Sequence, residues 1–165
     1  MTAHEPELHF FRAATPLPLI VHRGALAPGE GAAERCQRLF AEHDWTGAWV
    51  DGIYPYDHFH ATTHEVLGIV RGEARVRFGG DAGESVTVAA GDVVVIPAGV
   101  SHRREQGSGD LSVVGAYPQG RAPDIEKGTP AAPVRRDLAV VPVPAAHPVF
   151  GREGPLPRLW SKGAR

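Results

Sequence analysis

The sequence lacks the features that would direct it to a membrane, to nucleic acid or to an oxidising compartment. Cys36 is the only cysteine among 165 residues, which excludes an internal disulfide and favours a reducing cytoplasm. No apolar run approaches the length that spans a bilayer, and residues 1–24 lack the basic and apolar segments of a signal peptide. The formal net charge of −2 gives no reason to expect a nucleic acid or an anionic membrane as partner.

Helical periodicity is also scarce, and one segment carries it. The stretch "GAAERCQRLFAEHDW" places an apolar stripe on one helical face, with Gly47 just beyond its end; the stripe consists of Ala33, Cys36, Leu39 and Phe40. We therefore expect one short N-terminal helix. Cys36 falls at an apolar position of this helix, which favours a packed side chain over a nucleophile.

From about Trp45 the sequence changes to short β-branched runs separated by glycine-containing turns. The runs cover 65–70, 74–78, 84–88, 93–97 and 111–117. Many short strands at close intervals predict an all-β sandwich or barrel and argue against a parallel α/β sheet. The stretch "FGGDAGE" is glycine-rich, but no helix follows it, so we interpret it as a hairpin turn and not as a phosphate loop.

Prolines mark the C-terminal region. Nine of the fifteen prolines lie from Pro118 onward, and proline removes a backbone donor and disfavours helix interiors. We expect a single domain, 1–165, with a barrel core at about 45–118 and a proline-rich, extended arm at 119–165. The arm either packs over the barrel or exchanges with a second subunit. Because barrel sheets also leave edges, we expect a homodimer.

Three histidines and a glutamate are crowded into the stretch "HFHATTHE". On a strand, His58 and His60 share one face, roughly 7 Å apart, so that two imidazoles can meet one metal ion at about 2.1 Å each. Glu65 can add an oxygen if the chain turns at "ATT", so that the strand 65–70 lies beside the strand of the histidines.

Two other interpretations of this cluster are weaker. His60 and His64 have the spacing of helical zinc ligands, but Ala61 stands where such sites carry a glutamate. Thr62 and Thr63 are β-branched and disfavour a helix. Polar residues scattered on a solvated strand would explain one histidine but not the spacing around all of them.

That spacing resembles the two motifs of the cupin family. The first motif is matched by Gly52, five residues, His58-x-His60, four residues, Glu65, six residues and Gly72. The second is matched by Gly91, five residues, Pro97-x-Gly99, two residues and His102. The match covers 52–106, and the sequence also resembles a group of bacterial single-domain cupins, the YjlB-like proteins. One departure is Gln106, where the second motif usually closes with asparagine.

The resemblance implies an all-β, double-stranded β-helix (a cupin jelly-roll barrel) that holds a metal through His58, His60, Glu65 and His102. Three neutral imidazoles and one carboxylate suit one divalent transition metal: Fe, Mn, Ni, Co, Cu or Zn. Pro97 fits position i+1 of a turn and Gly99 position i+3, which would start the strand that carries His102 inward. His64 should face away from the metal, as a supporting or surface residue.

Strand alternation predicts which side chains surround this metal. Tyr54 and Tyr56 share the parity of His58, although Pro55 could introduce a bulge, and Arg104 and Gln106 share the parity of His102. Plain barrel core for the tyrosines and a solvated arginine remain the alternatives.

The resemblance implies a metal-dependent enzyme of oxygenase, isomerase or decarboxylase type that acts on a small polar or anionic molecule, with catalytic residues unassigned. A non-catalytic cupin that binds or senses a small molecule is the alternative.

Overall fold

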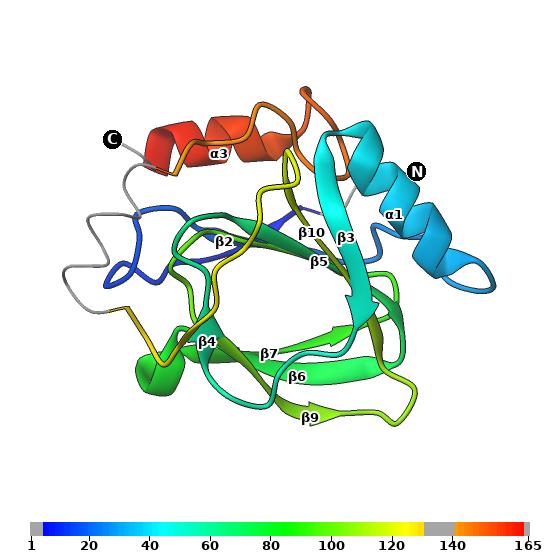
Figure 1. Ribbon diagram of the computed structural model, residues 1–165, viewed down its shortest axis with the longest axis horizontal. Helices are drawn as coiled ribbons and strands as arrows, with labels where there is room; N and C mark the ends of the chain where they lie inside the picture. The colour runs from blue at the N-terminus through cyan, green and yellow to red at the C-terminus, as the bar shows by residue number, and fades with distance from the viewer. Residues whose placement is uncertain (1–4, 131–140, 164–165) are drawn as a thin grey trace.

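Two antiparallel sheets build most of the protein in the computed structural model, which describes residues 5–130 and 141–163 (Figure 1). The six-stranded sheet has the order β1 (Glu7–His9), β2 (Leu19–His22), β8 (Val93–Ile96), β5 (Glu65–Arg71), β10 (Ser112–Pro118) and β3 (Trp45–Asp51). The five-stranded sheet has the order β11 (Glu126–Lys127), β4 (His58–Phe59), β9 (His102–Gly107), β6 (Glu73–Phe78) and β7 (Glu84–Ala89). The sheets face each other, which confirms the predicted all-β barrel.

Each of the five predicted β-branched runs forms a strand, namely β5, β6, β7, β8 and β10. The short helix η1 (Gly80–Ala82) joins β6 to β7 as an antiparallel pair, so "FGGDAGE" is a hairpin connection as predicted. Two strands, β1 and β2, precede the expected core at 45–118, and β2 pairs with β8 inside the six-stranded sheet. The sheet therefore begins well before Trp45.

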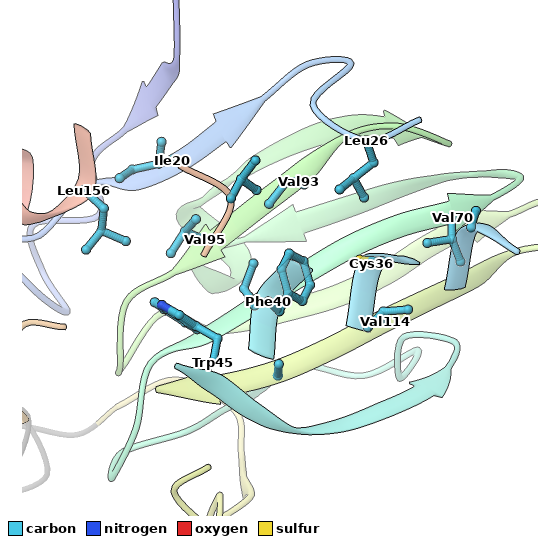
Figure 2. Close-up of a cluster of buried hydrophobic side chains, with 14 of the residues drawn as sticks. Ile20, Leu26, Cys36, Phe40, Trp45, Val70, Val93, Val95, Val114 and Leu156 are labelled. Atoms are coloured by element: carbon cyan, nitrogen blue, oxygen red, sulfur yellow. The ribbon is translucent and has the colours of Figure 1, made fainter. Parts of the chain in front are cut away.

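The central strand β5 explains why its sequence shows no polar alternation. Val66 and Val70 pack on the outer side of the six-stranded sheet, in the cluster that contains Phe40 (Figure 2). Leu67 and Ile69 point to the other side, into a second cluster shared with β6 and β7 of the opposite sheet. Both faces of β5 are thus removed from water, which favours a continuous apolar run.

Helix α1 (Ala32–Glu42) covers the outer face of the six-stranded sheet. Its side chains Cys36 and Phe40 are buried there. Gly68 of β5 lies directly beneath, because a Cβ at this position would come within 2.6 Å of the Cys36 Sγ atom. The interior glycine of β5 therefore lets the helix approach the sheet closely.

The end of α1 differs from the prediction. The helix ends at Glu42, because Asp44 adopts the left-handed conformation (φ 66°) and Trp45 already begins β3. Gly47 does not follow the helix end but lies inside β3, also with a positive φ of 69°. None of the helices in the described residues has the length and apolar composition needed to cross a membrane.

One part of the described C-terminal region departs from the extended arm that its prolines led us to expect. Residues Pro155–Gly163 form helix α3. Pro155 and Pro157 occupy its first turn, where a helix does not use its N–H groups, so both are tolerated. Trp160 is fully buried and donates a hydrogen bond from Nε1 to the carbonyl oxygen of Pro18 (2.9 Å). The expectations for 131–140 and 164–165 lie outside the described residues.

Candidate metal centre

Three strands bring the four predicted ligands together. His58 begins β4 and His102 begins β9, and the two residues are directly paired in the five-stranded sheet. His60 follows β4 immediately. Glu65 begins β5, which belongs to the six-stranded sheet, so it reaches the histidines across the barrel. The prediction that the strand 65–70 lies beside that of His58 is therefore wrong, although it placed Glu65 at the same centre.

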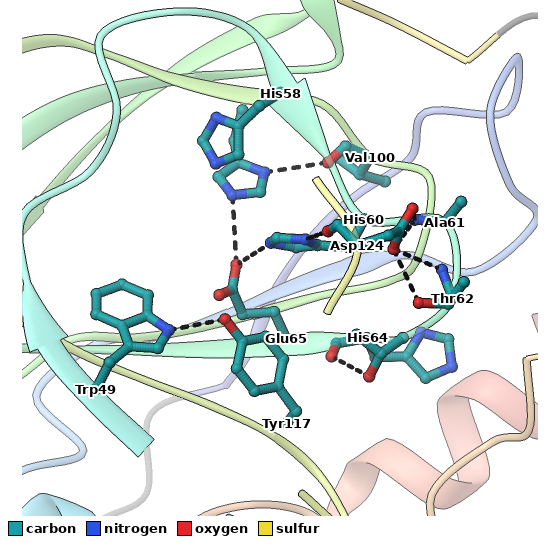
Figure 3. Close-up of polar contacts among 12 residues, drawn as sticks. Trp49, His58, His60, Ala61, Thr62, His64, Glu65, Val100, Tyr117 and Asp124 are labelled. Carbon is teal, nitrogen blue, oxygen red and sulfur yellow. Dashed lines mark hydrogen bonds and ion pairs between the residues drawn. The ribbon is translucent and has the colours of Figure 1, made fainter. Parts of the chain in front are cut away.

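The imidazoles and the carboxylate converge at one point. One ring nitrogen from each of His58, His60 and His102 lies within 4.8 Å of the others. The Glu65 Oε1 atom is 3.3 Å from Nε2 of His60 and 3.4 Å from Nε2 of His102 (Figure 3). All four residues are at most 6% exposed. Distances of this size leave room between the donor atoms for one cation.

The opposite nitrogen of each imidazole faces a backbone carbonyl. Nδ1 of His58 lies 3.1 Å from the Tyr56 oxygen, and Nδ1 of His102 lies 3.2 Å from the Val100 oxygen. Nδ1 of His60 bonds the Asp124 oxygen at 2.5 Å. Because a carbonyl oxygen only accepts, Nδ1 carries the proton in each ring, and the Nε2 lone pair is free in the neutral form. This is the tautomer of a metal-ligating histidine supported from behind.

A turn between β8 and β9 orients His102. The Val100 amide donates to the Pro97 carbonyl (3.2 Å), so Pro97 is position i of this turn and Gly99 is position i+2. The predicted turn began one residue too early. Gly99 has φ 92°, which position i+2 of a type II turn requires, and its amide donates to the carbonyl of His60 (2.9 Å). The turn thus connects the two motif segments directly.

The buried carboxylate dominates the electrostatics of the centre. Burial would raise the pKa of Glu65, but hydrogen bonds and charge from His102 and His60 hold it well below its usual range. Burial lowers the pKa of His58 to about 4. For His60 the effect of burial is outweighed by Glu65, and the pKa rises. A buried negative charge therefore requires a positive charge among the imidazoles, which a proton or a metal ion can supply.

Tyr117 of β10 is a site residue that the sequence analysis did not identify. Its hydroxyl oxygen accepts a hydrogen bond from Nε1 of Trp49 (2.8 Å; Figure 3). Burial, together with the charge of Glu65, raises the pKa of Tyr117 above its ordinary range. The indole of Trp49 lies over Gly115, where a Cβ would come within 2.2 Å of the ring. A glycine inside the run "SVVGAY" was the available signal, since an interior strand glycine often marks a close approach.

Asp124 was also missed. Its carboxylate accepts hydrogen bonds from the amides of Ala61 (2.9 Å) and Thr62 (3.0 Å) and from the Thr62 hydroxyl (2.9 Å), while its carbonyl accepts from His60. The following strand β11 pairs with β4. The chain after β10 therefore closes the histidine side of the barrel. Because His60 is supported by a backbone carbonyl of a residue distant in sequence, no local pattern predicts this contact.

A cavity of about 760 Å³ opens above the four converging residues. Tyr54 and Arg104 line it as predicted, whereas Tyr56 and Gln106 do not belong to its lining. Tyr56 instead stacks behind Tyr54, with ring centroids 5.0 Å apart. Gln106 is turned away because the pairing of β9 with β6 shifts register between Gln106 and Arg104, and a bulge breaks the alternation.

His64 faces away from the other histidines, as predicted, but it is buried and not at the surface (Figure 3). Its Nδ1 accepts the amide hydrogen of Ala98 (2.8 Å), so Nε2 carries the proton and donates to the Pro142 carbonyl (3.1 Å). Burial lowers the pKa of His64 to about 4. His64 thus fastens the C-terminal region to the barrel.

Comparison with known proteins agrees with this barrel and with the two motifs. Residues 49–114 match the family described as Cupin domain. The uncharacterized protein YjlB of Bacillus subtilis (strain 168) is 39% identical over 147 residues, which cover 88% of this chain and 87% of that protein. The chain therefore belongs to the cupin family, and the resemblance to YjlB-like cupins is confirmed.

Solved structures are more distant. A TDP-quinovose 3,4-ketoisomerase of Campylobacter jejuni, WlaRB, is 13% identical with a TM-score of 0.42, over 54% of this chain and 73% of that chain. Acireductone dioxygenase of Bacillus anthracis, with a cadmium ion in its active center, is 18% identical with a TM-score of 0.40, over 55% of this chain and 62% of that chain. Similarities this low say nothing about the reaction of this chain.

Proposed function

We propose that the protein binds one divalent transition metal through His58, His60, Glu65 and His102 and is a metal-dependent enzyme that acts on a small polar or anionic molecule. The observation that carries the proposal is the common orientation of the three imidazoles. Each one has Nδ1 against a backbone carbonyl, and Nε2 of His60 and of His102 faces the buried carboxylate of Glu65. A surface cluster of histidines would not need three separate backbone supports.

The donor set also fits the metals that we propose. Three neutral imidazoles with one carboxylate suit Fe, Mn, Ni, Co, Cu or Zn, and all four residues are buried. When bound, such a metal supplies a Lewis acid or an oxygen-activating centre. The chain's own residues then orient the small molecule: Tyr117 and Trp49 form one wall of the cavity, and Arg104 supplies a positive charge on another.

Arg104 differs from its neighbours in the five-stranded sheet. Arg75, Arg77 and Arg103 each form an ion pair with a carboxylate. Arg104 lines the cavity, where its Nε donates to the carbonyl of Ile53 (3.1 Å), and it forms no ion pair with any of the residues described. An arginine fork without a carboxylate partner suits an incoming anion.

We expect the protein to act in the cytoplasm as a homodimer that binds neither nucleic acid nor membrane. The lone thiol supports the compartment, because a chain with a single cysteine cannot form an internal disulfide and fits a reducing environment. The formal net charge of −2 supports the absence of a nucleic-acid partner.

The test is turnover. Protein stripped of metal and then loaded separately with each candidate metal should be incubated in air and without oxygen with small carboxylates and enediol-type compounds, and products identified by mass spectrometry. Metal-dependent product formation that the His102→Ala variant lacks is the expected result. Saturable binding with no product under any metal would contradict catalysis and support the non-catalytic, sensing cupin.

A further inference from the structure

Exposed apolar side chains gather at the mouth of the cavity. Among the described residues, six large apolar residues are strongly exposed, and the two most exposed of them, Tyr54 and Ile125, both line this one cavity. Their exposed fractions are 47% and 52%. We refer to these two residues as the lip. Single exposed apolar residues are ordinary, but the two most exposed ones at one opening indicate a surface that a ligand covers.

The lip is assembled from separate parts of the chain. Tyr54 belongs to the loop between β3 and β4, and Ile125 directly precedes β11. Tyr54 is held in place because it stacks on Tyr56 and places its ring 5.1 Å from that of His58, nearly perpendicular. Tyr54 therefore links the mouth of the cavity to the first of the histidines.

Arg104 provides the opposite kind of contact in the same cavity. It is the one arginine or lysine in the lining, among the described residues, and its amide donates to the carbonyl of Tyr54 (2.9 Å). This backbone hydrogen bond places Arg104 next to Tyr54 of the lip. A wholly polar anion would leave the lip exposed, and an uncharged apolar molecule would leave the guanidinium without an acidic partner.

We propose that the cavity takes an amphipathic organic anion, a carboxylate whose acidic group lies beside Arg104 and whose apolar body lies along the lip. This rests on the proposed function in using the same cavity and the same anion partner. A volume of about 760 Å³ is far larger than a minimal carboxylate needs and lies in the range of sites for drug-sized molecules. The lip selects for apolar length, and Arg104 selects for charge.

The experiment is a chain-length series. Straight-chain monocarboxylates from acetate to octanoate are titrated calorimetrically into the full chain, once loaded with zinc and once metal-free. Affinity should rise by roughly twofold to fourfold per methylene, since burial of a methylene gives at most about a fourfold gain. The double variant Tyr54→Ser/Ile125→Thr should flatten this dependence. Leu8→Thr, an exposed apolar residue away from the cavity, is the matched control and should leave it unchanged.

Arg104→Met tests the charged end. It should weaken every carboxylate by about tenfold or more while leaving the gain per methylene intact. Octanol, which has the apolar body without the acid, should bind far more weakly than octanoate. The proposal is overturned if no carboxylate binds saturably, if the lip variant keeps the full dependence on length, or if Leu8→Thr loses it equally.

The zinc-loaded and the metal-free titrations distinguish a failure of this inference from a failure of the proposed function. A protein that takes up no metal but shows the lip-dependent series in its metal-free form would refute the metal centre and support the ligand class. A protein that binds metal with the four ligands but shows no dependence on chain length would support the metal centre and refute the ligand class.

Discussion

The indole nitrogen of Trp49 donates a hydrogen bond to the Tyr117 hydroxyl across a glycine of the neighbouring strand. Trp49 is paired directly with Gly115, and the indole fills the space that a side chain there would occupy. Since an indole N–H only donates, the Tyr117 hydroxyl accepts at this point and directs its own proton elsewhere, toward Glu65 or a ligand. Gly115 thus determines how the wall of the cavity is built.

Gly115→Ala should displace the Trp49 indole and lower the free energy of unfolding by roughly 1–3 kcal/mol, because a Cβ would overlap the ring. Urea denaturation measures the loss. Gly109→Ala is the control, since nothing lies within 4 Å of a Cβ there and no positive φ is required. Equal stability of the two variants would show that the indole does not depend on the glycine.

Asp124→Ala should weaken metal binding by about tenfold to a hundredfold, which is the usual effect of removing a group that supports a metal ligand. The substitution releases the amides of Ala61 and Thr62 and thereby loosens the carbonyl that orients His60. Competition with a chelator of known affinity measures the change. Asp124→Asn, which keeps one accepting oxygen, should recover part of it. Asp110→Ala, at an exposed ion pair with Arg71, should have no effect, and an equal loss there would contradict the argument.

A buried histidine pair outside the metal centre should make stability depend on pH. His22 of β2 and His147 of the C-terminal region place their Nε2 atoms 2.7 Å apart. Nδ1 of His147 accepts the amide hydrogens of Val149 and Phe150, so its Nε2 must carry the proton that it shares with His22. Burial lowers the pKa of His22 to about 4, and burial together with His22 and His43 lowers that of His147 to about 3.

In the unfolded chain these imidazoles take up protons as the pH falls through about 6.5, whereas in the folded protein they do so only near pH 4 or below. The stability that this pair contributes is therefore present above about 6.5 and is lost as the pH falls toward 4. Each proton gives a slope of about 1.4 kcal/mol per pH unit. Urea denaturation in the presence of a chelator, from about pH 7 to about pH 5, should show this decline in the free energy of unfolding.

His22→Gln removes one titrating ring and keeps an oxygen that can accept from His147. The decline with falling pH should therefore be shallower in this variant than in the wild type. His9→Gln, outside the pair, is the control and should follow the wild type. An unchanged slope in His22→Gln would show that the pair does not account for the dependence.

The oligomeric state is a separate prediction. β1 is an edge strand of the six-stranded sheet, and Leu8 and Phe10 beside that edge are 37% and 45% exposed. We expect light scattering to give the mass of two chains at micromolar concentration. The mass of a single chain across that range would reject the homodimer.

The sequence predicted the site through residues that act locally. Two imidazoles separated by one residue share a strand face, so His58 and His60 could be placed together from spacing, whereas His102 was assigned through the resemblance to the second cupin motif. The same alternation placed Arg104 correctly but failed for Gln106. A bulge adds one residue to β9, and the sequence "RREQG" contains no pattern that predicts it.

Other features depend on contacts between distant segments and could not be predicted. The support of His60 by Asp124 links positions 64 residues apart through a backbone atom. Proline content led to the expectation of an extended arm, yet two prolines at the start of α3 are compatible with a helix whose Trp160 is fully buried in the core cluster that contains Ile20 and Val66. Tertiary packing of one aromatic side chain outweighs local composition there.

Metal content of single variants tests the central claim most directly. Elemental analysis of the wild-type protein should give about one transition-metal ion per chain. His58→Ala, His60→Ala, Glu65→Ala and His102→Ala should each lose most of it while circular dichroism confirms that they remain folded. His64→Ala, one residue from Glu65 but turned toward Pro142, should retain it. Full metal content in Glu65→Ala or His102→Ala, or loss confined to His64→Ala, would contradict the account.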